Sequence, residues 1–211
     1  MLSIEENRQA YHRLLAEKTL LNLAVRGIDG EYIEDKDTAL QRILALIPHG
    51  SSVSKGGSAT IDELRVIEAL HNSGCQIIDP NSGKDGVEKD AIAHDAIAAD
   101  VYLMSANAIS ATGEIVNIDV IGNRVSALCY GPKRILMVVG INKLTQDLPS
   151  AIQRAKGIAS SMTVLAHNQR FEDFDGLDSA GEHAGNQMLV TTGSVISGRL
   201  HVIIVGEQLG Y

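Results

Sequence analysis

Residues 105–143 read SANAISATGEIVNIDVIGNRVSALCYGPKRILMVVGINK. Within this stretch, Glu114 to Asp119 alternates apolar and polar residues, Val125 to Tyr130 has the pattern of a short helix, and Arg134 to Val139 is a continuous apolar run. Parallel strands that are covered on both faces have such continuous runs. The stretch therefore predicts buried strands with a short helix between them.

Alternating strand and helix patterns continue on both sides of this stretch. Asp37 is expected to cap one helix, and Thr60 with Glu63 to form the capping box of the next. Helices are expected over residues 4–23, 37–47, from 60 onward, 87–98 and 148–165, and strands over residues 51–54, 76–79, 98–104, 188–191 and 199–205. Repeated strand–helix units are typical of parallel sheets. The predicted fold class is therefore α/β, a mostly parallel sheet flanked by helices on both faces, in one domain over residues 1–211 with an N-terminal helical extension over residues 1–30.

Composition excludes several classes of protein. The chain has 211 residues, of which 45% are hydrophobic, and this is enough for one full core. Its net charge of -8 and its 3% aromatic content, with no Trp, argue against a nucleic-acid partner, which requires a basic face and stacking rings. The longest apolar stretches are too short to cross a bilayer. We therefore expect a cytoplasmic protein that binds neither nucleic acid nor membrane.

Sequence patterns for common cofactors are missing. Cys75 and Cys129 stand alone in apolar surroundings, so buried free thiols without a disulfide are expected. None of the seven histidines has ligand spacing with a third donor, and no G-x-G-x-x-G fingerprint for NAD is present. An exposed acidic loop is expected at Glu172, Asp173, Asp175, Asp178 and Glu182. We therefore expect no metal site, and the cofactor, if there is one, is unknown.

Polar residues gather where the predicted strands and helices end. In α/β proteins, ligands bind beyond the carboxyl ends of the strands. Between Gly122 and Gly157 there are six basic residues and one acid. The polar residues at element ends are Asn107, Asn117, Asp119, Asn123, Arg124, Asn142 and Lys143. A small anion is the expected ligand, and solvated element ends are the alternative.

The loop after the strand at 51–54 has the composition of an anion cradle. Its residues are Lys55, Gly56, Gly57, Ser58 and Thr60. The glycines let backbone N–H groups approach a ligand, and the hydroxyls add further donors. A tight strand-to-helix turn is the alternative. Gly56, Asn107 and Asn142 each follow a predicted parallel strand, so this loop and the 105–143 stretch are expected to meet at one sheet edge.

Asp119, Asn123 and Arg124 form the most informative polar cluster. Ile118 and Ile121 are expected to anchor the backbone around them. Arg124 has the chemistry to bind a carboxylate bidentately, with Asp119 fixing its guanidinium. A buried Arg–Asp pair that holds the strand to the helix is the alternative.

Three stretches of the chain resemble the lactate-utilisation (LUD-domain) family. They are NLAVRGIDGEYIEDKDTALQRILALIPHGSSVSKGGSATIDEL at residues 22–64, ADVYLMSANAISATGEIVNIDVIGNRVSALCYGPKRILMVVGINKL at 99–144, and GRLHVIIVGEQLGY at 198–211. The resemblance covers nearly the whole chain in order. It implies a fold related to ribose-5-phosphate isomerase, CoA transferases and 5-formyltetrahydrofolate cyclo-ligase, and an association with the oxidation of lactate to pyruvate.

The resemblance also bears on single residues. Asn107 stands where methylthioribose-1-phosphate isomerase and its translation-initiation-factor relatives have a catalytic Asp, and an amide cannot transfer a proton at neutral pH. Asn107 is therefore expected to orient a hydroxyl or carboxylate, or to close a turn. Glu114 could correspond to the catalytic Glu of CoA transferases, and a solvent-exposed turn residue is the commoner alternative. Many relatives carry a cysteine-rich stretch before the last strands; this chain has no cysteine cluster there.

These observations predict a protein of lactate or other organic-acid utilisation that binds a small carboxylate- or phosphate-bearing metabolite at the C-terminal edge of the sheet. A non-catalytic regulatory or structural subunit that uses the same pocket as a sensor is the alternative, and catalysis itself stays open. Other lactate-utilisation proteins are expected partners, and homo-oligomerisation is left open. The catalytic candidates are Glu114, Asp119, Arg124 and Lys143. The expected ligand-binding residues are Lys55, Gly56, Gly57, Ser58, Thr60, Asn107, Asn117, Asp119, Asn123, Arg124, Gly140, Asn142 and Lys143.

Overall fold

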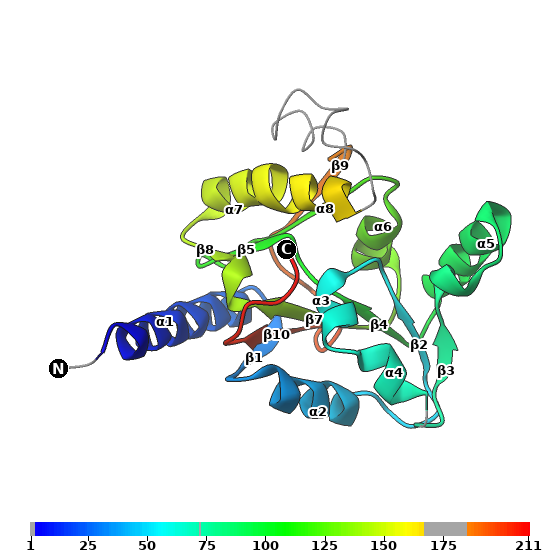
Figure 1. The fold of residues 1–211 in the computed structure, drawn as a ribbon, viewed down its shortest axis with the longest axis horizontal. Coiled ribbons are helices and arrows are strands. Elements are labelled where there is room, and N and C mark those ends of the chain that lie inside the picture. The colour runs from blue at the N-terminus through cyan, green and yellow to red at the C-terminus, as the bar shows by residue number, and fades with distance from the viewer. Residues whose placement is uncertain (1–2, 72, 167–184) are drawn as a thin grey trace.

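Six parallel strands form the main sheet of the computed structural model, which describes residues 3–71, 73–166 and 185–211. In spatial order they are β1 (Asp29–Ile33), β10 (Leu200–Val205), β7 (Arg134–Gly140), β4 (Val101–Met104), β2 (Ser52–Lys55) and β3 (Gln76–Ile78). Every neighbouring pair is parallel; Tyr102 of β4, for example, lies opposite Ile135 of β7. The C-terminal ends of all six strands therefore lie along one edge of the sheet (Figure 1).

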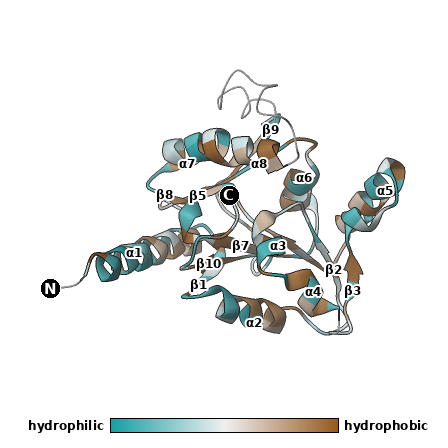
Figure 2. Cartoon of the chain, viewed as in Figure 1, coloured by the Kyte–Doolittle hydropathy of each residue, from teal (hydrophilic) through white to brown (hydrophobic). Residues whose placement is uncertain are grey.

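Both faces of the main sheet are covered, which accounts for its continuous apolar runs. Leu136 and Val138 of β7 belong to the core on one face, whereas Met137 and Val139 belong to the core on the other. The first core includes residues of α2 (Lys36–Leu46), α3 (Ala59–Glu63) and α4 (Val66–Leu70). The second includes residues of α1 (Ile4–Val25), α5 (Gly86–Ala96) and α6 (Asn123–Tyr130). Figure 2 shows helices of mixed hydropathy around more hydrophobic strands.

A second, four-stranded sheet packs on the second face. Its order is β8 (Leu144–Thr145), β5 (Ala108–Ser110), β6 (Ile115–Asp119) and β9 (Gln187–Thr191). β5 pairs antiparallel with β6 because only the turn from Ala111 to Glu114 joins them, and so short a turn reverses the chain. Gly113 makes this turn with φ 95°, which favours glycine. Asn117 and Asp119 therefore belong to this second sheet and not to the main one.

A helical layer covers the outer face of the second sheet. It consists of α7 (Leu148–Arg154), a π-helical segment (Ala155–Ser160) and α8 (Ser161–Ala166). Ala151 and Ala155 pack against Val116 and Ile118 of β6. The layers are thus α2 to α4, the main sheet, the second sheet with α1 and α6, and α7 with α8 (Figure 1).

The predicted α/β class with a mostly parallel sheet is confirmed, and several details differ. The sequence pattern missed β1, β5, β8 and the second sheet. Asp35, not Asp37, caps α2, because its side chain accepts the Thr38 N–H. Ser58, not Thr60, caps α3, which leaves Thr60 inside the helix. The thiols are free as expected, but they are not buried: Cys129 is exposed and Cys75 partly exposed.

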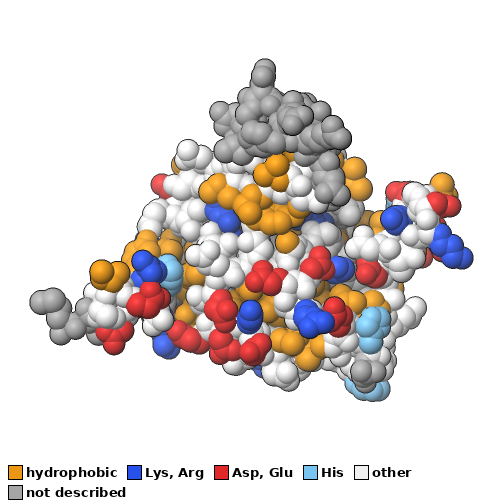
Figure 3. All heavy atoms as spheres, viewed as in Figure 1, with side chains coloured by type: hydrophobic (Ala, Val, Ile, Leu, Met, Phe, Trp, Pro, Cys, Tyr) orange, Lys and Arg blue, Asp and Glu red, His pale blue; other side chains and the backbone are white. Residues whose placement is uncertain are grey.

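Surface features bear on the expected partners. Acidic and basic side chains are interspersed on the face shown in Figure 3, with no separate basic patch there. Within the described ranges, no helix has the length and apolar character needed to cross a membrane. The acidic loop predicted at residues 172–182 lies outside the described residues.

Candidate functional site

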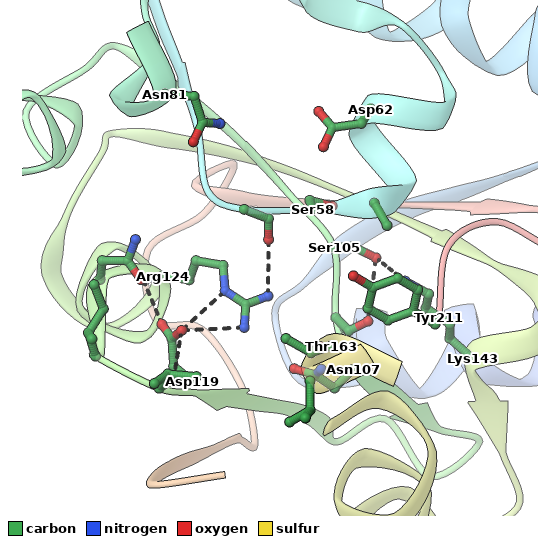
Figure 4. A pocket seen from close by; sticks show the side chains of 17 residues that line it. Ser58, Asp62, Asn81, Ser105, Asn107, Asp119, Arg124, Lys143, Thr163 and Tyr211 are labelled. Atoms are coloured by element: carbon green, nitrogen blue, oxygen red, sulfur yellow. Dashed lines mark hydrogen bonds and ion pairs between the residues drawn. The ribbon is translucent and has the colours of Figure 1, made fainter. Parts of the chain in front are cut away.

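A cavity of about 550 Å³ lies at the C-terminal edge of the main sheet (Figure 4). The loops after β2 and β4, the start of α6, the segment after β7 and helix α8 all contribute to its wall. The lining residues are Gly57, Ser58, Ala59, Asp62, Asn81, Ser105, Ala106, Asn107, Asp119, Val120, Ile121, Asn123, Arg124, Lys143, Thr163, Val164 and Tyr211. The 55–60 loop and the 105–143 stretch therefore meet in one cavity, as the topology of parallel strands predicts.

The register of three adjacent strands explains why these loops meet. Lys55 of β2 lies opposite Leu103 of β4, and Met104 of β4 lies opposite Met137 of β7. β2, β4 and β7 all end at the same edge of the sheet. Ser58, Ser105 and Lys143 therefore lie after neighbouring strand ends. Residues far apart in sequence are thereby brought to one cavity wall.

Lys143 is the most unusual group in the cavity. It is only 2% exposed, and its Nζ donates to Oγ1 of Thr60 at 2.7 Å and to Oγ of Ser105 at 3.0 Å. Burial lowers the pKa of Lys143 to about 7, and the positive charges of Arg154 and Arg124 act in the same direction, whereas Glu63 opposes them. An amine that is partly unprotonated at neutral pH can accept a proton or attack a carbonyl.

Asn107 presents an amide donor to the cavity. Its Oδ1 accepts the backbone N–H of Ile118 at 2.8 Å, which fixes which end of the amide carries the NH2 group. Its backbone oxygen accepts a hydrogen bond from the buried Arg154. No acceptor for Nδ2 of Asn107 lies within the described part of the chain, although the residue is only 8% exposed. The side-chain NH2 group of Asn107 is therefore available to a ligand in the cavity.

The side chains of Arg124 and Asp119 form hydrogen bonds with the backbone and also line the cavity. Oδ2 of Asp119 accepts the backbone N–H of Arg124 at 2.8 Å and so holds the first turn of α6. Nη2 of Arg124 donates to the Ile118 carbonyl at 2.6 Å, and its contacts with Asp119 and with the Gly57 carbonyl are longer, at 3.4 Å. Gly56 makes room for this side chain, because a Cβ there would lie 2.4 Å from Cγ of Arg124. Arg124 thus bonds to the backbone around it and also lines the cavity.

Both carboxylates that line the described cavity wall already have cationic partners. Asp62 forms an ion pair with Lys55, whose side chain is buried, and Asp119 pairs with Arg124. Lys143, by contrast, has only hydroxyl partners among the residues that the structure describes. Figure 4 shows Arg124 and Lys143 on different sides of the cavity, with Asn107 between the elements that carry them.

Several predicted site residues do not line the cavity but form hydrogen bonds with the residues or segments that do. Thr60 holds Lys143, and Asn117 donates from Nδ2 to the Ser105 carbonyl at 3.1 Å. Asn142 bonds to the backbone of Leu209 and Gly210, beside Gly140. Lys55, Gly56, Thr60, Asn117, Gly140 and Asn142 are absent from the cavity lining.

Glu114, a predicted catalytic candidate, does not line the cavity. It pairs with Arg26 and accepts hydrogen bonds from Ser110 and Thr112, and its side chain is 13% exposed, so it is not the exposed turn residue favoured from the sequence. Burial by itself would raise the pKa of Glu114, but the hydrogen bonds from Ser110 and Thr112 and the charge of Arg26 together lower it. Ile121, expected as an anchor, is 74% exposed and lines the cavity, whereas Ile118 is buried.

Sequence reasoning missed five polar residues of the cavity wall: Asp62, Asn81, Ser105, Thr163 and Tyr211. Ser105 was open to prediction from the sequence, because it directly follows β4 and lies two residues before Asn107 in the same loop. Thr163 and Tyr211 reach the cavity only through tertiary packing. Within the described residues, no group of three or more His, Cys, Asp or Glu side chains could hold a metal ion.

Comparisons with known proteins bear on the family. The chain matches the LUD domain family model over residues 16–205. A crystal structure of a DUF162 family protein from Deinococcus radiodurans is similar over 98% of this chain and 100% of that chain, with 17% sequence identity and a TM-score of 0.50. This likeness supports the fold. No curated protein sequence matches the chain.

Weaker structural matches are subunits from Chaetomium thermophilum. eIF2B delta matches with 13% identity and a TM-score of 0.35, over 57% of this chain and 54% of that chain. eIF2B beta matches with 13% identity and a TM-score of 0.33, over 64% of this chain and 44% of that chain. The family model, by contrast, spans most of the sequence, and on that ground this chain belongs to the LUD-domain family.

Proposed function

We propose that this LUD-domain protein binds a small carboxylate- or phosphate-bearing metabolite in the cavity at the C-terminal edge of the main sheet. One observation carries the proposal. Nitrogen donors of Arg124, Asn107 and Lys143, from three separate elements, line one cavity in a chain whose net charge is -8. The proposal places the protein in the cytoplasm, in lactate or other organic-acid utilisation beside other proteins of that process.

The donors have capacity left for an anion. A protonated Lys143 has three N–H groups, and Thr60 and Ser105 accept only two of them. Nδ2 of Asn107 has no acceptor among the described residues. The contacts of Arg124 with Asp119 are long, so its guanidinium can turn part of its N–H groups to a ligand carboxylate. Charge-assisted bonds of this kind supply both affinity and orientation.

Binding of an anion should be coupled to protonation of Lys143. An opposite charge nearby favours the charged form of an amine, so a bound carboxylate raises the pKa of Lys143 above its value of about 7 in the free protein. The ligand therefore brings a proton with it at neutral pH. Affinity for an organic acid is expected to fall as the pH rises above about 7, and this dependence separates Lys143 from the permanently charged Arg124.

A sensor without catalysis is the second candidate, and one observation favours it. Asp62 and Asp119, the carboxylates of the described cavity wall, are both engaged in ion pairs and do not offer a free general base. The cavity then serves only to detect a metabolite. Catalysis in this protein would have to use other groups.

A thermal-shift series tests the binding proposal. Lactate, pyruvate, phosphosugars, CoA esters and folates are each added to the wild-type protein, since a ligand of the native state raises the melting temperature. Arg124→Ala is expected to remove the shift produced by the best ligand while the protein stays folded. Arg42→Ala is the matched control, because Arg42 pairs with Glu31 on the surface and does not line the cavity.

One outcome would count against the proposal, and a second would move the test to another residue. If none of these compounds shifts the melting temperature at millimolar concentration, the cavity does not bind this class of metabolite. If Arg124→Ala and Asp119→Ala both unfold or aggregate, the pair is structural, and Asn107→Asp then tests the ligand contact in its place, since Asp keeps the acceptor for Ile118 but repels an anion.

A further inference from the structure

Ser105 and Lys143 form a buried pair that simple anion binding does not require. Oγ of Ser105 and Nζ of Lys143 lie 3.0 Å apart, and the two residues are 4% and 2% exposed. Both still line the cavity, so a ligand can reach them. A hydroxyl held by a buried amine at an open cavity has the geometry of a nucleophile with its base.

The hydrogen bonds around the pair favour proton transfer from the Ser105 hydroxyl to the Lys143 amine. The Thr60 hydroxyl has the Leu209 carbonyl as its acceptor at 3.3 Å, so Oγ1 of Thr60 is left to accept an N–H of Lys143 at 2.7 Å. The only other acceptor for the Ser105 hydroxyl within the described part of the chain is the Ala106 carbonyl at 3.4 Å, a long contact. The lone pair of a neutral Lys143 is therefore available to the Ser105 hydroxyl.

We propose that Ser105 and Lys143 form a Ser–Lys catalytic dyad, in which Ser105 attacks the acyl carbon of an ester or thioester of a small organic acid. The substrate class rests on the proposed function, since the acid is the kind of metabolite that the cavity is proposed to bind. Ser–Lys pairs are a known variant of the nucleophile–base arrangement. Thr60 is a positioning residue that holds the amine.

The reaction balances with water as the only co-reactant. Oγ of Ser105 forms a bond to the acyl carbon and passes its proton to Nζ of Lys143. The bond from the acyl carbon to the leaving oxygen or sulfur then breaks, and Lys143 returns the proton to that atom. Water then attacks the acyl carbon of the acyl-serine and gives a proton to Nζ of Lys143. The bond from the acyl carbon to Oγ of Ser105 breaks, and Lys143 returns the proton to Oγ. The products are the free acid and an alcohol or thiol, and no group is oxidised or reduced.

Neighbouring groups fit this chemistry. Burial, together with the charges of Arg154 and Arg124, lowers the pKa of Lys143 to about 7, which gives a useful fraction of neutral base at neutral pH. Nδ2 of Asn107, two residues after the nucleophile, is a donor with no acceptor among the described residues and is available to the carbonyl oxygen. Arg124 remains for a carboxylate on the acyl group.

Acylation by p-nitrophenyl acetate tests the dyad on the intact protein. The wild type is expected to release one nitrophenolate per chain in a burst, to gain the mass of one acetyl group, and to carry it on Ser105 in peptide mapping. Ser105→Ala is expected to lose the burst and the adduct. Ser54→Ala is the matched control, because Ser54 is equally buried on β2 but donates to the Ile78 carbonyl at 2.7 Å and lies outside the cavity lining.

The lysine is tested by rate and by pH profile. Lys143→Met is expected to slow acylation of Ser105 by about 10²- to 10⁴-fold. Thr60→Val should keep the reaction and move its apparent pKa, because the amine loses one partner. If Ser105→Ala does not fold, Ser105→Cys replaces it and should acquire the acetyl group on the thiol.

Three outcomes overturn the dyad: no adduct on the wild type, an adduct on Ser105 whose rate is unchanged in Lys143→Met, or an adduct on the Lys143 amine instead. The thermal shift by organic acids separates this failure from failure of the proposed function. A wild type that is shifted by an acid but not acylated leaves the binding function standing without the dyad. A wild type that is acylated on Ser105 but shifted by no acid leaves the dyad standing with another substrate class.

Discussion

Nζ of Lys143 lies 2.7 Å from Oγ1 of Thr60, although 83 residues separate them in the sequence. The bond links the segment after β7 to helix α3, and β4 lies between the strands that precede them. Lys143 is held there by hydroxyls and not by a carboxylate, so no ion pair with another described residue offsets its burial. A lysine in this setting makes the stability of the protein depend on pH.

The free energy of unfolding is expected to rise between about pH 7 and pH 10 through Lys143. Its pKa is about 7 in the native protein, against 10.5 for an ordinary lysine. In this window the unfolded chain binds the proton that the native chain has released, and stability then increases with pH. At about 1.4 kcal/mol for each pH unit, the contribution is up to about 5 kcal/mol.

Lys143→Met shows this contribution directly. The variant should be more stable than the wild type below about pH 7, and its advantage should shrink as the pH approaches 10. The gain is smaller than the full electrostatic contribution, because the hydroxyls of Thr60 and Ser105 lose a partner. Urea unfolding of both proteins across this pH range measures the difference, and parallel curves would contradict the assignment of a low pKa to Lys143.

Glu114 is expected to serve stability and not ligand binding. Arg26 bonds to Glu114, to the Thr112 carbonyl at 3.0 Å and to the Thr192 carbonyl at 2.8 Å, so the pair joins the β5–β6 turn to the end of β9. Glu114→Gln should lower the free energy of unfolding by about 1–3 kcal/mol and leave the ligand-induced thermal shift unchanged. Denaturant unfolding and the thermal-shift assay measure the two effects.

Glu5→Gln is the control for Glu114→Gln. It removes an ion pair with Arg8 whose side chains are about three-fifths exposed, and it should change stability by less than about 0.5 kcal/mol. A Glu114→Gln variant with normal stability and no ligand response would reverse the interpretation and restore Glu114 as a catalytic candidate.

The sequence predicts the elements whose patterns are long or uniform. The apolar run of β7 is recovered because this strand is buried on both faces, and β6 is recovered because Asn117 and Asp119 alternate with apolar residues, although all five of its residues are buried. β5 and β8 have three and two residues, too few for any period to show. β1 reads DGEYI, and its first residues are exposed at the edge of the sheet. No apolar pattern marks such a strand.

The site was predictable only as far as strand ends could be placed. Asn107 and Lys143 follow β4 and β7, and the rule for parallel sheets brings them to one edge. The sequence predicts Thr60 as a helix cap, but its hydroxyl bonds to Lys143, and Ser58 caps the helix instead. Ser and Thr have similar capping preferences, so local sequence does not choose between them. Contacts across 83 residues, such as Thr60 with Lys143, depend on packing of the whole chain.

The two thiols are expected to react at different rates in the native protein. Cys129 is exposed on α6, whereas Cys75 is only partly exposed and lies near the Pro48 carbonyl. A thiol reagent should therefore label Cys129 first and Cys75 more slowly, with both labelled at once after unfolding. Timed labelling followed by peptide mapping measures this, and Cys129→Ser is the control that should lose the fast phase. Equal rates in the native state would contradict the difference in exposure.

Asn142 is expected to act on the cavity through the segment that it holds. Its Oδ1 accepts the Leu209 N–H at 3.1 Å and its Nδ2 donates to the Gly210 carbonyl at 3.2 Å, and the next residue, Tyr211, lines the cavity. Asn142→Ala should lower the free energy of unfolding by about 1–3 kcal/mol through the two lost bonds. It should also reduce the ligand-induced thermal shift without removing it, because Arg124 and Lys143 stay in place.

Asn22→Ala separates these two effects. Asn22 also ties distant segments together, since its Nδ2 donates to the Ala111 carbonyl at 2.8 Å, but it does not line the cavity. The control should therefore lose stability and keep the full ligand response, whereas Asn142→Ala loses part of both. An Asn142→Ala protein of wild-type stability that no longer responds to any ligand would place the Asn142 side chain in direct contact with the ligand, as the sequence alone predicted.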